Sequence, residues 1–175
     1  MQRYVNYFAI QSTKFNKYKD NFTSMGIQIR FARKEDIQAI RELVMELAIY
    51  EKEPESVTAT QDDYEKAFSD DLISMLVAEM KIDGNFIIVG MTLYYDTFST
   101  WRGKMLYLED FVVSEKYRGH GIGDQLFDAT LKEAKDRGCV MMKWQVLDWN
   151  TGAVKFYERK GATIEKEWWN GKIIF

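Results

Sequence analysis

The chain has 175 residues, of which 46% are hydrophobic and 29% charged, as is usual for one soluble globular domain. A net charge of −3 without a basic run gives no support for nucleic-acid binding, and no stretch approaches the roughly 18 consecutive apolar residues of a membrane span. One Cys and one His exclude an internal disulfide and the usual zinc sites, so we expect a cytoplasmic protein without a bound metal.

Residues 1–25 carry scattered aromatic side chains among Lys and Asn, without helical or strand spacing. We interpret them as an N-terminal extension of unknown role, ahead of a domain predicted over residues 26–175. Met25 directly precedes the first strand pattern. A translation start at Met25 and a surface arm that binds a partner are therefore both open interpretations.

The first half of the domain reads as strand, helix, acidic stretch and two strands. Ile27, Ile29 and Phe31 alternate with polar residues and predict a strand, and apolar spacing predicts a helix over about residues 34–50. Residues 51–71 hold eight carboxylates and predict a solvated loop with a short helix; alternatively, they attract a cationic substrate. Strands are then predicted over 73–79 and 86–95, followed by a loop over 96–103.

The next stretch combines a strand with a basic, glycine-rich turn. Residues 106–113 read LYLEDFVV and predict the central strand, and apolar spacing from Ile122 predicts an amphipathic helix that ends at Gly138. Between them lies RGHGIG, at 118–123. The first N–H groups of a helix lack internal partners and lie at the positive end of its dipole, so this turn is suited to phosphate. Its spacing fits neither a P-loop nor the GxGxxG dinucleotide motif.

The last elements are short. Residues 140–147 predict a strand, and Asn150 is a favourable N-cap for a helix that ends at Gly161. Residues 162–168 and 173–175 predict a terminal strand pair about Asn170-Gly171. The order of elements predicts a mixed α/β sheet.

Four motifs carry a family resemblance. The RGHGIG turn after a strand resembles the acetyl-coenzyme A signature of the GNAT superfamily of N-acetyltransferases, supported by DWN at 148–150 and FYERKGA at 156–162. LAIYE at 47–51 and LYLEDF at 106–111 make the chain most similar to the diamine acetyltransferases, which act on spermidine, spermine or thialysine. The resemblance covers about residues 27–168. It implies a mostly antiparallel mixed sheet flanked by helices, with a splay between the central strand and the next strand.

The resemblance also implies an activity. We expect acetyl-CoA-dependent transfer of an acetyl group to the primary amine of a small cationic acceptor, such as a diamine, a polyamine or a thialysine-like amine, by a homodimer. The open alternatives are a GNAT enzyme for another amine (a peptide N-terminus, an amino acid or an antibiotic) and a non-catalytic CoA-binding regulator. Polyamine enzymes carry Asp-Pro before the cleft tryptophan, whereas this chain has Ser99-Thr100, which weakens the case for a long polycation.

Two residues match the family's catalytic groups. Glu109 matches the proposed general base, and Tyr157 matches the general acid that protonates the departing thiolate. A carboxylate of ordinary pKa, about 4.3, is a weak base unless burial raises that pKa, so Glu109 as base, as ammonium ligand or as a structural ion pair are all open. Asp110 faces away from Glu109 in a regular strand, and both face the substrate only if the strand is bulged.

The remaining site residues also follow from the resemblance. The implied substrate contacts are Tyr50, Glu51, Trp101 and Asp110. The implied acetyl-CoA contacts are Phe111, Val112, Val113, Arg118, Gly119, His120, Gly121, Ile122, Gly123, Asp124 and Asn150. Asn150 serves either the pantetheine arm or only its own helix.

Overall fold

The computed structural model describes residues 26–174, which form two compact units divided between Lys143 and Trp144. The first unit contains β1 Ile27–Phe31, α2 Ile37–Tyr50, α3 Gln61–Ser69, β2 Ser74–Ile82, β3 Asn85–Ser99, β4 Gly103–Val113, α4 Ile122–Asp136 and β5 Met141–Lys143. The second contains α5 Thr151–Arg159. None of the helices in the described part of the chain has the length and apolarity needed to cross a membrane.

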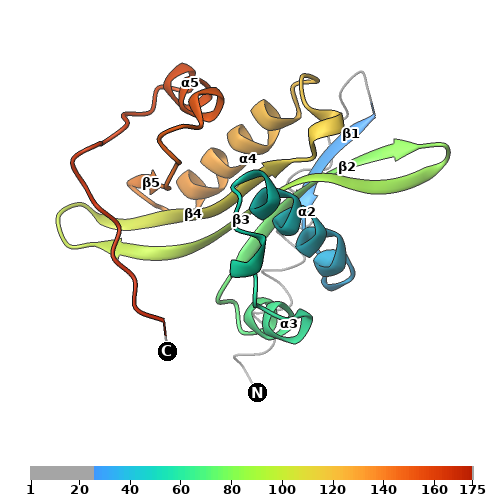
Figure 1. The fold of residues 1–175 in the computed structure, drawn as a ribbon, viewed down its shortest axis with the longest axis horizontal. Helices are drawn as coiled ribbons and strands as arrows, with labels where there is room; N and C mark the ends of the chain where they lie inside the picture. Colours follow the sequence, from blue (N-terminus) through green and yellow to red (C-terminus); the bar gives the residue numbers. More distant parts are fainter. Residues whose placement is uncertain (1–25, 175) are drawn as a thin grey trace. The chain divides into compact units, whose positions relative to one another are not determined.

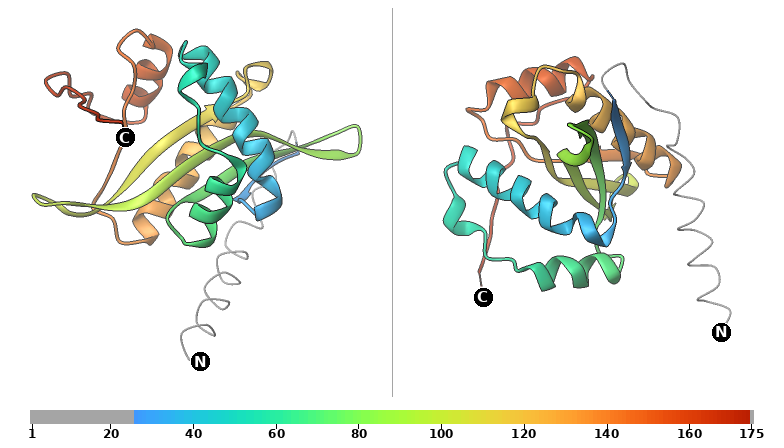
Figure 2. Two further views of the ribbon diagram at one scale, coloured as in Figure 1. Left: turned by 60° about the horizontal axis from the view of Figure 1, so that its bottom comes forward. Right: turned by 90° about the vertical axis from the view of Figure 1, so that its right-hand side faces the viewer.

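The sheet of the first unit has the order β1-β2-β3-β4-β5. The first three pairings are antiparallel, and β4 pairs with β5 in parallel. Helices α2 and α3 cover one face of this sheet and α4 covers the other (Figures 1 and 2). The predicted mixed, mostly antiparallel sheet flanked by helices is therefore confirmed.

Each face of the sheet has its own core. On the α2 face, Ile40 and Leu43 belong to one buried cluster with Met91 and Leu93 of β3. On the α4 face, the buried hydroxyls of Thr92 and Thr130 are hydrogen-bonded at 3.0 Å. Alternate β3 residues thus face opposite helices, as strand geometry requires.

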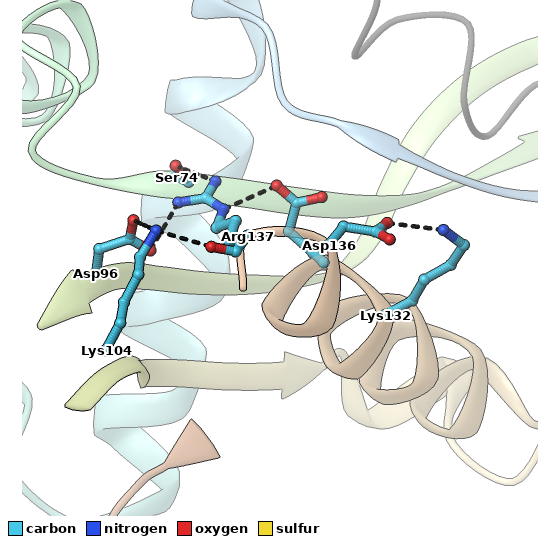
Figure 3. A network of polar contacts seen from close by, with 7 residues as sticks. Ser74, Asp96, Lys104, Lys132, Asp136 and Arg137 are labelled. Carbon is cyan, nitrogen blue, oxygen red and sulfur yellow. Dashed lines mark hydrogen bonds and ion pairs between the residues drawn. The ribbon is translucent and has the colours of Figure 1, made fainter. Parts of the chain in front are cut away.

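A polar network holds the end of α4 against the sheet (Figure 3). Arg137 donates to Glu133 at 2.8 Å, to Ser74 at 2.9 Å and to Asp96 at 3.2 Å. Lys104 donates to the Arg137 carbonyl at 3.0 Å and pairs with Asp96 at 2.9 Å. The network therefore ties α4 to three neighbouring strands.

The predicted loop over residues 96–103 is wrong. Strand β3 continues to Ser99 and pairs with β4 down to Ser99 opposite Gly103, so only residues 100–102 form the turn. The polar composition that suggested a loop is explained by pairing: Asp96 lies opposite Leu106 and forms ion pairs with Lys104 and Arg137. Charged partners across the hairpin make a polar strand end stable.

The predicted strand over 140–147 is shorter than expected, because β5 spans only Met141–Lys143. Its pairing with β4 ends at Tyr107 opposite Lys143, although β4 continues to Val113. The end of the pairing coincides with a bulge in β4, and a bulge bends a strand and increases its twist. The pairing with β5 therefore does not extend along residues 108–113 of β4.

In the second unit, the predicted helix is confirmed and the predicted terminal strand pair is wrong. The Asn150 side chain caps α5 by accepting from the Ala153 N–H at 3.2 Å. Residues 162–174 contain no strand, and Phe175 lies outside the described residues. Gly171 is not among the glycines with positive φ, so the Asn170-Gly171 turn does not take the form that closes a tight hairpin. The Asn170 side chain instead accepts a hydrogen bond from Gln145.

Candidate active site

A bulge in β4 brings Glu109 and Asp110 to the same face of the sheet. In the β3–β4 register Leu93 lies opposite Asp110 and Tyr94 opposite Leu108, so Glu109 is the extra residue. Leu93 belongs to the core beneath α2, and directly opposite residues of an antiparallel pair share a face. Asp110 therefore faces α2. The condition under which both carboxylates can face a substrate is met.

Glu109 is fixed by a tyrosine from the neighbouring strand. The Tyr95 hydroxyl donates to Glu109 Oε2 at 2.9 Å, and the Tyr95 ring stacks on Tyr107 with centroids 5.4 Å apart. Partial burial and the hydrogen bond to Glu109 raise the pKa of Tyr95 to about 12, so this phenol stays a donor at neutral pH. The sequence did not indicate Tyr95, since its cross-strand partner depends on the register.

Asp110 has a more buried and more crowded environment. Burial, followed by the charges of Glu109 and Glu51, raises the pKa of Asp110 to about 6. Burial also raises the pKa of Glu51, which directly follows α2. We call Glu51, Glu109 and Asp110 the carboxylate cluster. Three carboxylates within electrostatic range favour a cation between them.

A groove that includes Tyr64 was not predicted from the sequence. It has a volume of about 170 Å³ and lies between α2 and the chain from Val57 into α3, with Gln38, Arg41, Glu42, Val44, Met45, Val57 and Tyr64 as lining. The Arg41 guanidinium donates to the Ala59 carbonyl at 3.3 Å and pairs with no carboxylate among residues 26–174. Burial and the charge of Asp110 raise the pKa of Tyr64, whereas the charge of Arg41 lowers it. The Tyr64 phenol therefore lies within electrostatic range of both Arg41 and the cluster.

The glycine turn has the geometry that its sequence predicts. Gly119 and Gly121 have φ of 81° and 74°, in the left-handed region that glycine tolerates best. Gly121 is the N-cap of α4 and has no side chain that could accept from the first N–H groups of the helix. That end of the helix is therefore open to an external acceptor such as a phosphate.

Residues around this turn link it to the end of α2. The Arg118 guanidinium lies 5.4 Å from the ring centroid of Tyr50 and donates through Nε to the Val113 carbonyl at 2.9 Å. His120 is exposed, with Nδ1 3.2 Å from the Tyr117 carbonyl. In the described residues, predicted cofactor and substrate contacts thus meet where Tyr50 and Arg118 lie together.

The other predicted site residues lie elsewhere. Trp101 is 87% exposed in the turn between β3 and β4, and the six positions from Gly103 to Glu109 span about 20 Å of strand. Within one chain, Trp101 is therefore not part of the carboxylate cluster. Tyr157 belongs to the second unit, where its ring centroid lies 4.8 Å from that of Trp144. The catalytic role of Tyr157 and the acceptor contact of Trp101 stay predictions.

Comparison with known proteins identifies the family. A model of the acetyltransferase (GNAT) family matches residues 37–162. The chain belongs to the GNAT family. It is an N-acetyltransferase, in agreement with its relatives. It is 34% identical over 152 residues to a thialysine N-epsilon-acetyltransferase of Bos taurus, covering 82% of this chain and 89% of that protein.

Two further comparisons bear on substrate and fold. The GNAT chain is 36% identical over 147 residues to a human spermidine/spermine N(1)-acetyltransferase-like protein 1. That match covers 80% of this chain and 21% of the longer human protein. The crystal structure of an aminoglycoside acetyltransferase from an uncultured soil metagenomic sample, in complex with trehalose, superposes with a TM-score of 0.71 at 18% identity. That match covers 89% of this chain and 98% of the other, and it supports the GNAT fold alone.

Proposed function

We propose that this enzyme transfers the acetyl group of acetyl-CoA to the primary amine of a small cationic acceptor. The observation that carries the proposal is the carboxylate cluster, because the β4 bulge directs Glu109 and Asp110 to one face and Glu51 lies within electrostatic range. A cluster of this charge attracts an ammonium group and resists an anionic acceptor. The homologues named for thialysine and for spermidine or spermine are consistent with such an acceptor.

The glycine turn fits the pyrophosphate of acetyl-CoA. The side-chain-free N-cap and the positive φ of Gly119 and Gly121 leave backbone N–H groups accessible at the positive end of α4. In the proposal, the turn from Arg118 to Asp124 holds the pyrophosphate, and β4 residues 111–113, which lie beyond the end of the β5 pairing, hold the pantetheine arm. Acetyl-CoA supplies the thioester carbonyl that the amine attacks.

The chemistry assigns separate tasks to separate groups. An amine with a pKa of about 10.4 costs roughly 4 to 5 kcal/mol to deprotonate at neutral pH, so the reaction needs a proton acceptor, for which a carboxylate of the cluster is the proposed group. The departing thiolate needs a donor, for which the phenol of Tyr157 is the proposed group. Asn150 caps α5, and in the proposal its cap fixes the helix that carries Tyr157.

The groove beside Tyr64 favours an acceptor that also carries a carboxylate. Arg41 lines it without an ion-pair partner among residues 26–174, and Glu42, which also lines it, accepts from Gln38 at 3.0 Å. A guanidinium binds a carboxylate in a fork-like, bidentate geometry. An amino acid with a side-chain amine would satisfy Arg41 at one end and the carboxylate cluster at the other.

Acceptor pairs that differ only in the carboxylate test both statements. We expect CoA release with lysine, ornithine, thialysine, cadaverine and putrescine, with a lower KM for lysine than for cadaverine and a lower KM for ornithine than for putrescine. Arg41→Gln should remove that preference, whereas Lys66→Gln, an exposed change on α3 outside the groove, should keep it. Release with peptide N-termini or an aminoglycoside alone would instead favour another amine class. CoA binding without turnover of any amine would indicate a regulator.

A further inference from the structure

We propose that Asp110 accepts the proton of the bound ammonium group, and that Glu109 is a fixed ligand for that group rather than the base. This inference rests on the proposed function and divides the work between two adjacent carboxylates. Sequence similarity left the role of Glu109 open and gave Asp110 only a binding role. The β4 bulge makes the two candidates direct competitors, since both face the same side of the sheet.

Glu109 is suited to holding a cation in place. One of its oxygens already accepts from the Tyr95 hydroxyl at 2.9 Å, and that tyrosine is itself held by stacking on Tyr107. Glu109 is also exposed, so water stabilises its charge. A positioned carboxylate that stabilises an ammonium makes that ammonium harder to deprotonate. The contacts of Glu109 therefore support binding and oppose its use as the base.

Asp110 has the opposite set of properties. It is half-buried, and among residues 26–174 its carboxylate accepts no hydrogen bond from the protein. Both of its oxygens are therefore available to a proton. Burial and two neighbouring carboxylates disfavour its charged form, which strengthens it as a base. A pKa of about 6 in place of 3.8 makes proton transfer to Asp110 roughly 100-fold more favourable.

The groups around Asp110 come from each element packed against it. Glu109 precedes it in β4, Glu51 follows α2, and Tyr64 of α3 interacts with it electrostatically. Arg41 of α2 acts on Tyr64 from the groove side. The nearest charged neighbours of Asp110 are thus negative, and a bound ammonium would lower the pKa of Asp110 again unless its proton is transferred.

The proton balance is closed by these groups. One ammonium proton passes to an Asp110 oxygen and later to water, which restores the carboxylate. The freed lone pair forms the N–C bond as the C–S bond of the thioester breaks. Tyr157 donates its phenol proton to the departing sulfur, and a second proton of the amine then restores the phenol. The products are therefore the acetamide, CoA with a thiol and one released proton.

The pH dependence of kcat/KM separates the two carboxylates. Because the base must be unprotonated, we expect kcat/KM of the wild-type enzyme to rise with pH through a limb near pH 6. Asp110→Asn should abolish this limb and lower kcat by about 100-fold or more. Glu109→Gln should keep the limb but shift it to lower pH, because a neighbouring negative charge is lost, and should raise the acceptor KM about tenfold.

The reverse assignment gives the reverse result. If Glu109→Gln abolishes the limb and Asp110→Asn only shifts it, or if neither variant alters it, the proposal is overturned. Glu165→Gln, an exposed carboxylate change in the second unit, should leave the profile unchanged. Wild-type enzyme that acetylates no amine would instead refute the proposed function, and this inference would fall with it.

A measurement without turnover guards against misfolded variants. Carbon-13 NMR titration of the aspartate carboxyls of the free enzyme should show Asp110 titrating near pH 6 and moving to lower pH in Glu109→Gln. An Asp110 that titrates near 3.8 would overturn the proposal even if Asp110→Asn were inactive. Tyr95→Phe should raise the acceptor KM several-fold and leave the Asp110 limb in place, as expected for a residue that positions Glu109.

Discussion

Replacing Asp110 by Asn should make the protein more stable at neutral pH while it lowers activity. The carboxylate cluster destabilises the folded state at neutral pH. Asp110 is charged at that pH, and burial and the charges of Glu109 and Glu51 disfavour its charged form. The pKa of Asp110 is about 6 in the folded protein and 3.8 as the reference for the unfolded chain. A difference of about 2 pKa units corresponds to a ceiling of about 3 kcal/mol, and because solvent reaches part of this side chain we expect 1 to 3 kcal/mol.

The pH dependence gives this prediction its sign. The folded state binds the Asp110 proton more tightly than the unfolded chain does, so the penalty is fully present above about pH 6 and declines as the pH falls from 6 toward 4. Asp110→Asn should therefore gain the full amount at pH 7.5 and about half of it at pH 5. For a chain of this size, 1 to 3 kcal/mol corresponds to a rise in Tm of roughly 3 to 10 °C.

Urea and thermal denaturation at the two pH values measure the effect. Glu165→Gln is the control, since it also changes an exposed carboxylate to an amide outside the cluster and should change stability by less than about 0.5 kcal/mol. Equal stability of Asp110→Asn and wild type at pH 7.5, or a gain that grows at pH 5, would refute the account of a desolvated, crowded carboxylate.

Three further predictions concern the scaffold and the turn. Arg137→Ala should lower the free energy of unfolding, measured by urea titration, by about 3 kcal/mol, because it leaves the 5%-exposed Glu133 without its partner. Lys132→Ala, on the exposed side of α4, should lower it by under about 0.5 kcal/mol. Gly90→Ala should cost about 1 to 3 kcal/mol by calorimetry, because its Cβ would lie 2.9 Å from the Val112 carbonyl oxygen. Gly121→Ala should weaken CoA binding roughly 5- to 30-fold by titration calorimetry, whereas Gly138→Ala, with the same φ of 74° at the other end of α4, should lose stability but keep CoA affinity.

The glycine turn and the helices were predictable because the determining signals are local. Gly119 and Gly121 have positive φ, a conformation that glycine favours, and Asn150 caps α5, a position that asparagine favours. The apolar stripes that predicted α2 and α4 do pack against the sheet. Capping, period and glycine content each act within a few residues, so one sequence is sufficient to read them.

The decisive part of the site was not local. The bulge at Glu109 is defined by the pairing of β4 with β3, and residues 106–113 contain no Gly or Pro that would have indicated it. The bond from Tyr95 depends on the same register. Conversely, the residues predicted as terminal strands have the right apolar pattern but no strand partner within residues 26–174, and an isolated pair of strands is marginal in water.

The central claim is that a thioester held at the α4 turn is delivered to a cationic amine held by carboxylates. Incubation of the wild-type enzyme with acetyl-CoA and lysine or putrescine, followed by mass spectrometry of the amine and quantification of free thiol, tests it most directly. We predict an acetylated amine in equal amount to the CoA released, with the rate of formation of both lowered about 100-fold or more in Asp110→Asn. Folded enzyme that binds acetyl-CoA but leaves every cationic amine unmodified would contradict the account.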